Sequence, residues 1–249
     1  MDFTFKKYIE LLKELKNSEY SFMTFESFLQ KANEKSIVLR HDTDLLPLNS
    51  LAFAKVQAEY DVKGTYYFRA VPQSWDEDVI KTIRDLGHEI GYHYECLTTT
   101  KGNVEKGIED FQKNLEALRK LAPVSTICMH GSPMSKHDSK DLWKHYNYRD
   151  YGIIGEPYFD VDFKKVFYLT DTGRKWDGDK VSVRDRVDSG FDLCFHKTDE
   201  IIASAKKHQL PDQIMFTFHP QRWDNNKFKW TKELLLQNTK NIIKRIIKK

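Results

Sequence analysis

The chain has 249 residues, of which 40% are hydrophobic and 31% charged, the composition of an ordinary globular protein. Lysine and arginine number 40 against 37 acidic residues, so no concentrated basic character points to a nucleic-acid partner. The three cysteines are widely spaced and odd in number, which predicts no disulfide framework. No run approaches 18 apolar residues and no signal peptide is recognisable, so we expect a cytoplasmic protein without a transmembrane segment.

Apolar spacing predicts helices at both ends of one single domain of residues 1–249. Residues 5–15 place their apolar side chains on one face, and residues 24–34 begin with a capping Thr24. The tail "NIIKRIIKK" has isoleucine pairs at helical spacing, which favours a packed terminal helix with a solvated lysine face over a helix on a membrane surface. We therefore expect a helical extension over 1–35, a core over 36–223 and a terminal helix over 224–249.

Strand and helix patterns alternate through the core. The predicted strands are residues 36–41, 63–71, 88–95, 124–131 and 212–220. The predicted helices between or beside them are residues 49–61, 76–87, 103–122 and 199–210. Such alternation indicates a parallel sheet or barrel with the helices outside. Residues 145–195 are less regular, and their strands cannot be ordered from the pattern.

Ionisable side chains stand at or just after the ends of four of these predicted strands. The residues are Asp42, Asp44, His93, His130 and His219. Because the carboxyl ends of parallel strands meet at one edge, we expect these side chains to lie close together.

The chemistry of this set suggests metal-assisted hydrolysis of an amide or ester. Asp42 and Asp44 are two positions apart, so they can point to the same side of a strand. Asp44 could bind a cation while Asp42 accepts a proton from a bound water. Imidazoles complete a ligand set that suits zinc or a similar divalent ion. His219 could then protonate a leaving amine. Taken alone, the two aspartates would also suit an ordinary strand-to-helix turn.

The longer pattern "LRHDTD…GTYYFR…GHEIGYHYE…CMHGSP…TDTGRKW…FHPQRW" spans residues 36–223. It resembles the polysaccharide deacetylase superfamily, the NodB-like carbohydrate esterases of family four, and within it a subgroup from surface-polysaccharide biosynthesis clusters. The resemblance implies an α/β fold, a distorted (β/α) barrel of about seven strands. It also implies removal of an N-acetyl, formyl or other small acyl group from a sugar, with one divalent metal ion, zinc being the first choice. Because no export signal is recognisable, we expect that sugar to be nucleotide-linked or lipid-linked.

The resemblance implies roles for most of the strand-end residues. Asp42 matches the catalytic base, Asp44 the metal-binding carboxylate, His93 the first metal-binding imidazole and His219 the catalytic acid. The family's second motif is His-Ser/Thr-x-x-His, and its second histidine falls on Leu97.

A metal ligand is therefore missing at position 97. We expect His130 to replace it, with Glu95 as the second choice and His41 as the third.

Substrate-binding roles follow for two further segments. In "TDTGRKW", the resemblance makes Asp171, Arg174 and Trp176 candidates for orienting the base and lining the substrate pocket. Trp176 and Trp223 stand beside charged residues, a mixture suited to stacking on the C–H face of a sugar. Core packing explains both indoles equally well.

Two rival functions remain at this stage. The absent imidazole at Leu97 would also fit a metal-free carbohydrate-binding or scaffolding protein that has lost catalysis. Phosphoester hydrolysis would keep the metal, although the sequence lacks a recognisable carboxylate set for a second metal ion. The oligomeric state is left open.

Overall fold

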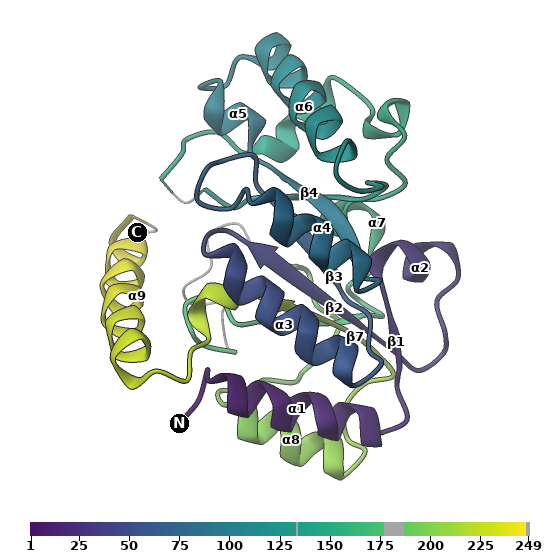
Figure 1. Cartoon of the computed structure of the whole chain (residues 1–249), viewed down its shortest axis with the longest axis vertical. Coiled ribbons are helices and arrows are strands. Elements are labelled where there is room, and N and C mark those ends of the chain that lie inside the picture. The colour runs from purple at the N-terminus through teal and green to yellow at the C-terminus, as the bar shows by residue number, and fades with distance from the viewer. Residues whose placement is uncertain (133, 177–186, 248–249) are drawn as a thin grey trace.

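The computed structural model of the chain describes residues 1–132, 134–176 and 187–247. Within these ranges seven strands form one sheet, in the order β5-β4-β3-β2-β7-β6, with β1 pairing to the first half of β2 (Figure 1). The strands are β1 Ser21–Met23, β2 Ser36–Thr43, β3 Thr65–Phe68, β4 Glu89–Tyr94, β5 Ile127–Met129, β6 Phe167–Thr170 and β7 Gln213–Phe218.

Every strand pair in this sheet is parallel, so each crossover carries the chain back along the outside. The helices are α1 Phe5–Asn17, α2 Phe25–Gln30, α3 Pro47–Glu59, α4 Glu77–Asp85, α5 Cys96–Thr99, α6 Val104–Arg119, α7 Pro157–Asp160, α8 Thr198–Lys206 and α9 Lys227–Ile247. The 3₁₀ turns within the described ranges are η1 Ser139–Lys144, η2 Tyr148–Tyr151 and η4 Pro220–Arg222. The sheet curls into a distorted (β/α) barrel, which confirms the expected fold class.

Side chains of β2 alternate between two cores. Leu39 belongs to the large core between the sheet and the outer helices. Val38 belongs to a smaller core, together with Tyr67, Cys128 and Met215 from neighbouring strands. Because side chains alternate along a strand, Arg40 and Asp42 share the face of Val38 and point into the barrel. The two charged residues are therefore carried by a strand that is buried along its whole length.

The first 35 residues hold two of the expected helices and one strand that the sequence pattern missed. Thr24 caps α2 as expected, because its Oγ1 accepts a hydrogen bond from the backbone N–H of Ser27 at 3.2 Å. β1 lies directly before this cap and pairs with β2. Helix α1 packs against α8 on the outside of the barrel (Figure 1).

The C-terminal helix α9 differs from its expectation. We expected the isoleucines of residues 241–249 to pack inward and the lysines to face solvent; Ile242 is exposed, and so are Phe228 and Leu235 earlier in the helix. Its inward face instead carries the buried amides Gln237 and Asn241. Of the isoleucines in residues 241–249, only Ile242 has a described side chain, so the packing of that tail as a whole stays a prediction. Residues 248–249 of the expected helix lie outside the described residues.

Across the described part of the chain, no helix combines the length and the apolarity needed to cross a bilayer.

His88 has a structural role, because its ring connects two backbone segments of the core. Its Nδ1 accepts from the Gly64 N–H at 3.1 Å, and its Nε2 lies 3.0 Å from the carbonyl oxygen of Ala54. Burial lowers the pKa of His88 from 6.5 to about 4. The unfolded chain therefore binds a proton in this pH window that the folded chain does not bind, and stability falls as the pH drops from 6.5 towards 4.

We expect His88→Gln to reduce this pH dependence, because an amide can both accept from Gly64 and donate to Ala54 without titrating. The difference in free energy of unfolding between pH about 7 and pH about 4 should shrink by about 3 kcal/mol relative to the parent protein. Urea unfolding at the two pH values measures it. An unchanged difference would show that His88 is charged in the folded state.

Candidate metal and catalytic site

Three potential metal ligands converge at the carboxyl ends of the strands. Asp44 follows β2, His93 lies near the end of β4, and His130 follows β5. Asp44 Oδ1 lies 3.5 Å from His93 Nε2 and 3.4 Å from His130 Nε2. One potential ligand atom from each residue lies within 4.8 Å of those of the other two. The sequence-based expectation that these positions share one edge therefore agrees with the geometry.

The hydrogen bonds on the far side of each imidazole fix which nitrogen carries the proton. His93 Nδ1 lies 2.9 Å from the carbonyl oxygen of Cys128, and His130 Nδ1 lies 3.0 Å from Glu95 Oε2. A carbonyl and a carboxylate can only accept, so both imidazoles donate from Nδ1. In the neutral form, each Nε2 then offers its lone pair towards Asp44. Metal-binding histidines in proteins are oriented in this way.

The carboxylate of Asp44 fits a cation in charge and in contacts. Its Oδ1 is buried and has no hydrogen-bond partner among the described residues, while Oδ2 accepts from Gln221 Nε2 at 3.0 Å. Burial raises the pKa of Asp44, but the neighbouring imidazoles outweigh burial and hold the pKa well below its usual range. An ionised oxygen without a partner between two imidazole nitrogens is the arrangement that a divalent cation completes.

The spacing also fits zinc. Nitrogen and oxygen ligands at about 2.0–2.2 Å from a tetrahedral zinc ion stand about 3.3–3.6 Å from one another. The two measured separations from Asp44 Oδ1, 3.4 and 3.5 Å, fall within this range.

A second group of potential ligands consists of Asp42, His93 and Cys128. It suits a metal less well because Asp42 is already engaged. Arg40 donates to its two oxygens from Nε at 2.8 Å and from Nη2 at 2.6 Å. Bidentate pairing of this kind fixes a carboxylate in direction as well as in charge.

Asp42 lies beside the candidate metal site without belonging to it. Its Oδ2 is 3.7 Å from His93 Nε2. Burial raises the pKa of Asp42, but the charges of Arg40 and His93 outweigh burial, and the pKa falls to about 2. The carboxylate is therefore ionised and able to accept a proton throughout the neutral pH range.

His219 reaches the same site from the end of β7. Its Nε2 lies 3.9 Å from Asp44 Oδ2, and its Nδ1 lies 2.6 Å from Asp171 Oδ1. Asp171 also accepts from the backbone N–H of His219 at 2.9 Å, so the imidazole is held at two points. Burial raises the pKa of Asp171, but the charges and hydrogen bonds of His219 and Arg222 outweigh it, and the pKa is lowered. The ionised Asp171 accepts from Nδ1 of His219, so Nε2 is the ring nitrogen that faces the site.

Glu95 and Arg69 hold His130 beside Asp44, so that His130 can serve in place of the histidine that is missing at position 97. Arg69 forms a bidentate pair with Glu95, from Nε at 2.8 Å and Nη2 at 2.9 Å, and its Nη1 donates to the carbonyl oxygen of Asp44 at 3.1 Å. Leu97 instead packs into the core beside α6, where a Cβ on Gly107 would come within 2.8 Å of Leu97 Cδ2. The geometry thus brings His130, our first choice, to Asp44.

The other two choices for the missing ligand are engaged elsewhere. Glu95 bonds to His130 and Arg69, so it orients a potential ligand. His41 points away from the barrel interior, with Nδ1 3.1 Å from the carbonyl oxygen of Thr65 and Nε2 2.8 Å from Gln57 Nε2. It lies on the opposite face of β2 from Asp42, because neighbouring residues of a strand point in opposite directions.

The expected substrate residues occupy different positions from those proposed. Asp171 is fully buried and binds His219, so it cannot contact a substrate or orient Asp42 directly. Trp223 is 0% exposed and donates from Nε1 to Asp171 at 2.6 Å. Trp176 is 4% exposed and donates to Thr198 Oγ1 at 2.9 Å. Both indoles therefore belong to the core, which corrects the expectation of sugar stacking.

Arg174 also departs from the expected role. It is 6% exposed, its guanidinium lies over the rings of Phe3 and Trp230, and Nη1 donates to the carbonyl oxygen of Trp230 at 2.9 Å. Its contacts attach α9 to the loop after β6 and leave no surface for a substrate in this conformation.

Three residues of the site were missed from the sequence. Arg40 could have been found, because it precedes Asp42 by two positions on a strand and must share its face. Arg69 and Gln221 gave no such signal, since their contacts with Glu95 and Asp44 join segments far apart in the chain.

Glu95→Gln tests whether this carboxylate supports the metal site. We expect a tenfold to hundredfold loss of zinc affinity, because partners of metal-binding histidines typically contribute about that much. Competition with a chromophoric chelator measures the affinity independently of turnover. Ser132→Ala is the matched control, because it removes the neighbouring hydroxyl, which contacts His130 Nδ1 at 3.1 Å and Glu95 Oε2 at 3.3 Å, and leaves the carboxylate of Glu95 in place. Equal affinities in the parent and Glu95→Gln would contradict the role.

Comparison with known proteins gives low similarity throughout. No family model matches the chain, and no curated protein matches it significantly. Among solved structures, a family 4 carbohydrate esterase from Streptococcus mutans shares 16% identity at a TM-score of 0.48, over 92% of this chain and 90% of that one. The family 4 esterase PdaA from Bacillus subtilis shares 14% sequence identity at a TM-score of 0.42, over 92% of this chain and 83% of that one.

A pseudoenzyme of the same esterase family, from Bacillus anthracis, is also similar. It shares 14% identity at a TM-score of 0.43, and 85% of this chain covers 62% of its length. The chain thus spans less than two thirds of that protein. At such identities and TM-scores, neither the activities nor the site residues of these proteins transfer to this chain.

Proposed function

We propose that the protein is a metal-dependent hydrolase that removes a small acyl group, such as acetyl or formyl, from the amide of an amino sugar. The observation that supports this proposal best is the unpartnered Asp44 Oδ1 between His93 Nε2 and His130 Nε2, with a second carboxylate and a third imidazole beside it. A phosphoesterase with two metal ions would need further carboxylates. Among the described residues, the groups of side chains that could hold a metal ion all lie in this one region and share His93.

Asp44, His93 and His130 would hold the cation. A divalent ion bound in this way polarises the acyl carbonyl and lowers the pKa of a bound water towards about 7. Asp42 accepts the proton of the attacking water, and Arg40 keeps its carboxylate ionised and aimed at the site. A carboxylate whose pKa is about 2 is a weak base towards free water. Asp42 can therefore act as the base only if the pKa of the attacking water is lowered.

His219 protonates the leaving nitrogen. Its Nδ1 proton is donated to Asp171, so Nε2 is the nitrogen that faces Asp44 and the substrate. Asp171 stabilises the charged imidazole before the proton leaves, and it holds the ring in one orientation. The base and the acid thus approach the site from two strands, β2 and β7, that pair directly in the sheet.

For the biological substrate, we propose a nucleotide-linked or lipid-linked amino sugar used in surface-polysaccharide synthesis, handled in the cytoplasm. The sequence motifs between residues 36 and 223 support this proposal by their resemblance to that group of deacetylases.

Zinc loading and removal test the function directly. We expect one equivalent of zinc per chain by elemental analysis after dialysis, and near-zero zinc in His93→Ala, because that residue supplies a buried ligand. Release of acetate or formate from N-acylated amino sugars should stop on addition of a chelator and return on addition of zinc. Leu97→His is the control, since it adds an imidazole away from the site and should not restore zinc to His130→Ala. A parent protein without stoichiometric zinc and without hydrolysis would favour the carbohydrate-binding alternative.

A further inference from the structure

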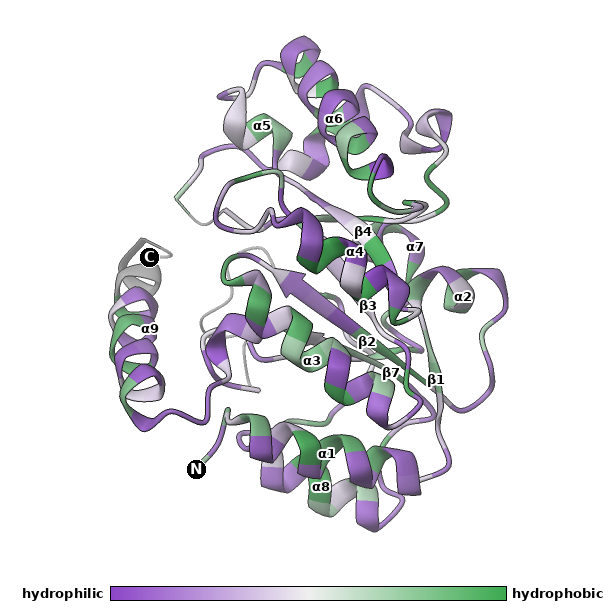
Figure 2. Cartoon of the chain, in the orientation of Figure 1, coloured by the Kyte–Doolittle hydropathy of each residue, from purple (hydrophilic) through white to green (hydrophobic). Residues whose placement is uncertain are grey.

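Helix α9 exposes an apolar stripe along its outer face. Phe228, Leu235 and Ile242 recur every seven residues and are 79%, 63% and 59% exposed. Leu236 stands beside them and is also exposed. Figure 2 shows hydrophobic stretches alternating with hydrophilic ones along the ribbon of α9. A helix usually buries its apolar stripe, so a face of this kind indicates a partner.

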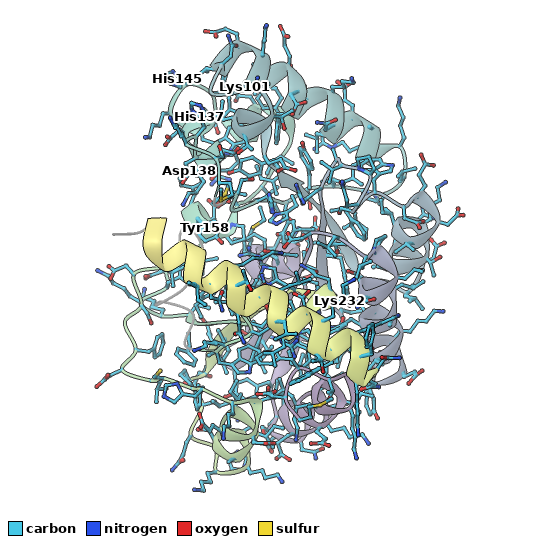
Figure 3. All side chains as sticks on the ribbon, turned by 90° about the vertical axis from the view of Figure 1, so that its left-hand side faces the viewer. Lys101, His137, Asp138, His145, Tyr158 and Lys232 are labelled. Carbon is cyan, nitrogen blue, oxygen red and sulfur yellow. The ribbon has the colours of Figure 1, made fainter. Side chains whose placement is uncertain are left out.

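Basic residues flank the stripe. Lys227, Lys229, Lys232 and Lys240 are all exposed, and Figure 3 shows Lys232 on the outer side of α9. Residues 224–249 contain eight basic and two acidic residues. One of the two acidic residues, Glu233, is partly buried and lies near Arg174. An apolar stripe with basic flanks is complementary to a surface that is apolar beneath and anionic at its boundary, as a bilayer is.

A second apolar surface lies beside the candidate metal site. Leu45 and Leu46 directly follow Asp44, and Leu48 stands in the first turn of α3; all three are exposed. They belong to the loop through which β2 leaves the barrel at its carboxyl end. In Figure 2 this loop is hydrophobic and lies on the same side of the molecule as α9.

Both surfaces lie where the strands end. α9 is attached to the loop after β6, because Asn241 Nδ2 donates to the carbonyl oxygen of Gly173 at 3.0 Å and Arg174 donates to that of Trp230. Figure 1 shows α9 on the side towards which the arrowhead of β2 points. Both apolar segments therefore lie at the end of the barrel that contains Asp42 and Asp44.

We propose that this end of the molecule docks on an anionic lipid bilayer. The docking face consists of Phe228, Leu235, Leu236 and Ile242 of α9 and Leu45, Leu46 and Leu48 of the loop before α3. A second copy of the chain fits this face less well, because two such helices would bring their lysines together. Given the proposed function, docking presents the site to an amino sugar whose carrier lipid stays in the membrane.

Vesicle sedimentation tests the docking face. We expect the full chain to bind vesicles of phosphatidylcholine with phosphatidylglycerol, and to bind phosphatidylcholine alone at least about tenfold more weakly, with binding that falls as salt rises. The double variant Phe228→Ser/Leu235→Ser should bind anionic vesicles at least about tenfold more weakly. Lys232→Gln/Lys240→Gln should lose on the order of twentyfold, because each lysine near a charged surface contributes about fivefold.

Phe159→Ser is the matched control, since it removes a 50% exposed aromatic on α7, away from α9 in Figure 1. Absence of binding by the parent, or an equal loss in Phe159→Ser, would overturn the proposal. So would a parent dimer in sedimentation velocity that the α9 variants convert to a monomer, which would assign the face to a second copy.

The outcome is separable from that of the proposed function. Hydrolysis of a short water-soluble N-acylated sugar should be unchanged in Phe228→Ser/Leu235→Ser, because these side chains lie outside the catalytic groups. Vesicle binding is measured without turnover, so an inactive protein that binds anionic vesicles would still support docking and would contradict only the proposed function.

Discussion

Replacing Asp42 by Asn is expected to lower turnover on the order of a thousandfold while zinc remains bound. An amide cannot accept the proton of the attacking water, whereas Asp44, His93 and His130 keep their ligand atoms. The readout is therefore twofold. Zinc content by elemental analysis should match that of the parent protein, and acyl release should fall to near the background rate.

The control for this variant concerns Arg40. Its guanidinium is buried and bonded to Asp42, so Asp42→Asn leaves a buried charge without a counterion, which typically costs about 3–5 kcal/mol. The double variant Arg40→Gln/Asp42→Asn removes both charges and should recover much of that stability without recovering turnover. A folded, zinc-loaded Asp42→Asn protein with full activity would refute the assignment of Asp42 as the base.

The parallel barrel was predictable because its signals are local. Buried runs such as residues 36–41 alternate with helices such as α3, α4 and α6, and parallel pairing accommodates that alternation. β1 was missed because three residues, Ser21–Met23, are too short to show a period of two. The order of β6 could not be deduced, since its position beside β7 depends on pairing between Phe167 and Ile214 across a less regular segment.

The grouping of the site residues was predictable for a topological reason. Carboxyl ends of parallel strands meet at one edge, so Asp44, His93 and His130 could be expected together before any coordinates were known. The surroundings of each residue were less accessible. Trp223 follows an arginine in the sequence, which suggested a sugar-stacking surface, yet its indole is buried against Asp171. Neighbours along the chain do not reveal the side to which a bulky side chain turns.

The direction of amphipathic surfaces was equally hidden. Residues 227–247 have the periodicity of an amphipathic helix, but the inward face carries Gln237 and Asn241. Gln237 donates to Asn241, and Asn241 donates to the carbonyl oxygen of Gly173, far away in the chain. A pattern therefore identifies two faces of a helix, whereas only the fold determines which one meets solvent.

His219→Ala is expected to lower amide hydrolysis on the order of a thousandfold, because an amine leaves poorly unless its nitrogen is protonated. An activated aryl ester provides the discriminating comparison. Its phenolate leaves without a proton, so the same variant should hydrolyse it within about tenfold of the parent rate. The ratio of the two rates, amide to ester, is the measurement, and zinc content should be unchanged.

The unequal response of the two substrates separates proton donation from simple positioning. If His219 only supported Asp44, whose Oδ2 lies 3.9 Å from its Nε2, its removal would disturb the metal site and slow both reactions equally. If it donates a proton, only the reaction with the basic leaving group suffers. Asp171 sharpens the comparison, because its hydrogen bond at 2.6 Å keeps Nε2 directed at the site. An equal loss of rate on the amide and the ester would therefore show that His219 only supports Asp44. The proton donor for the leaving amine would then have to be another residue.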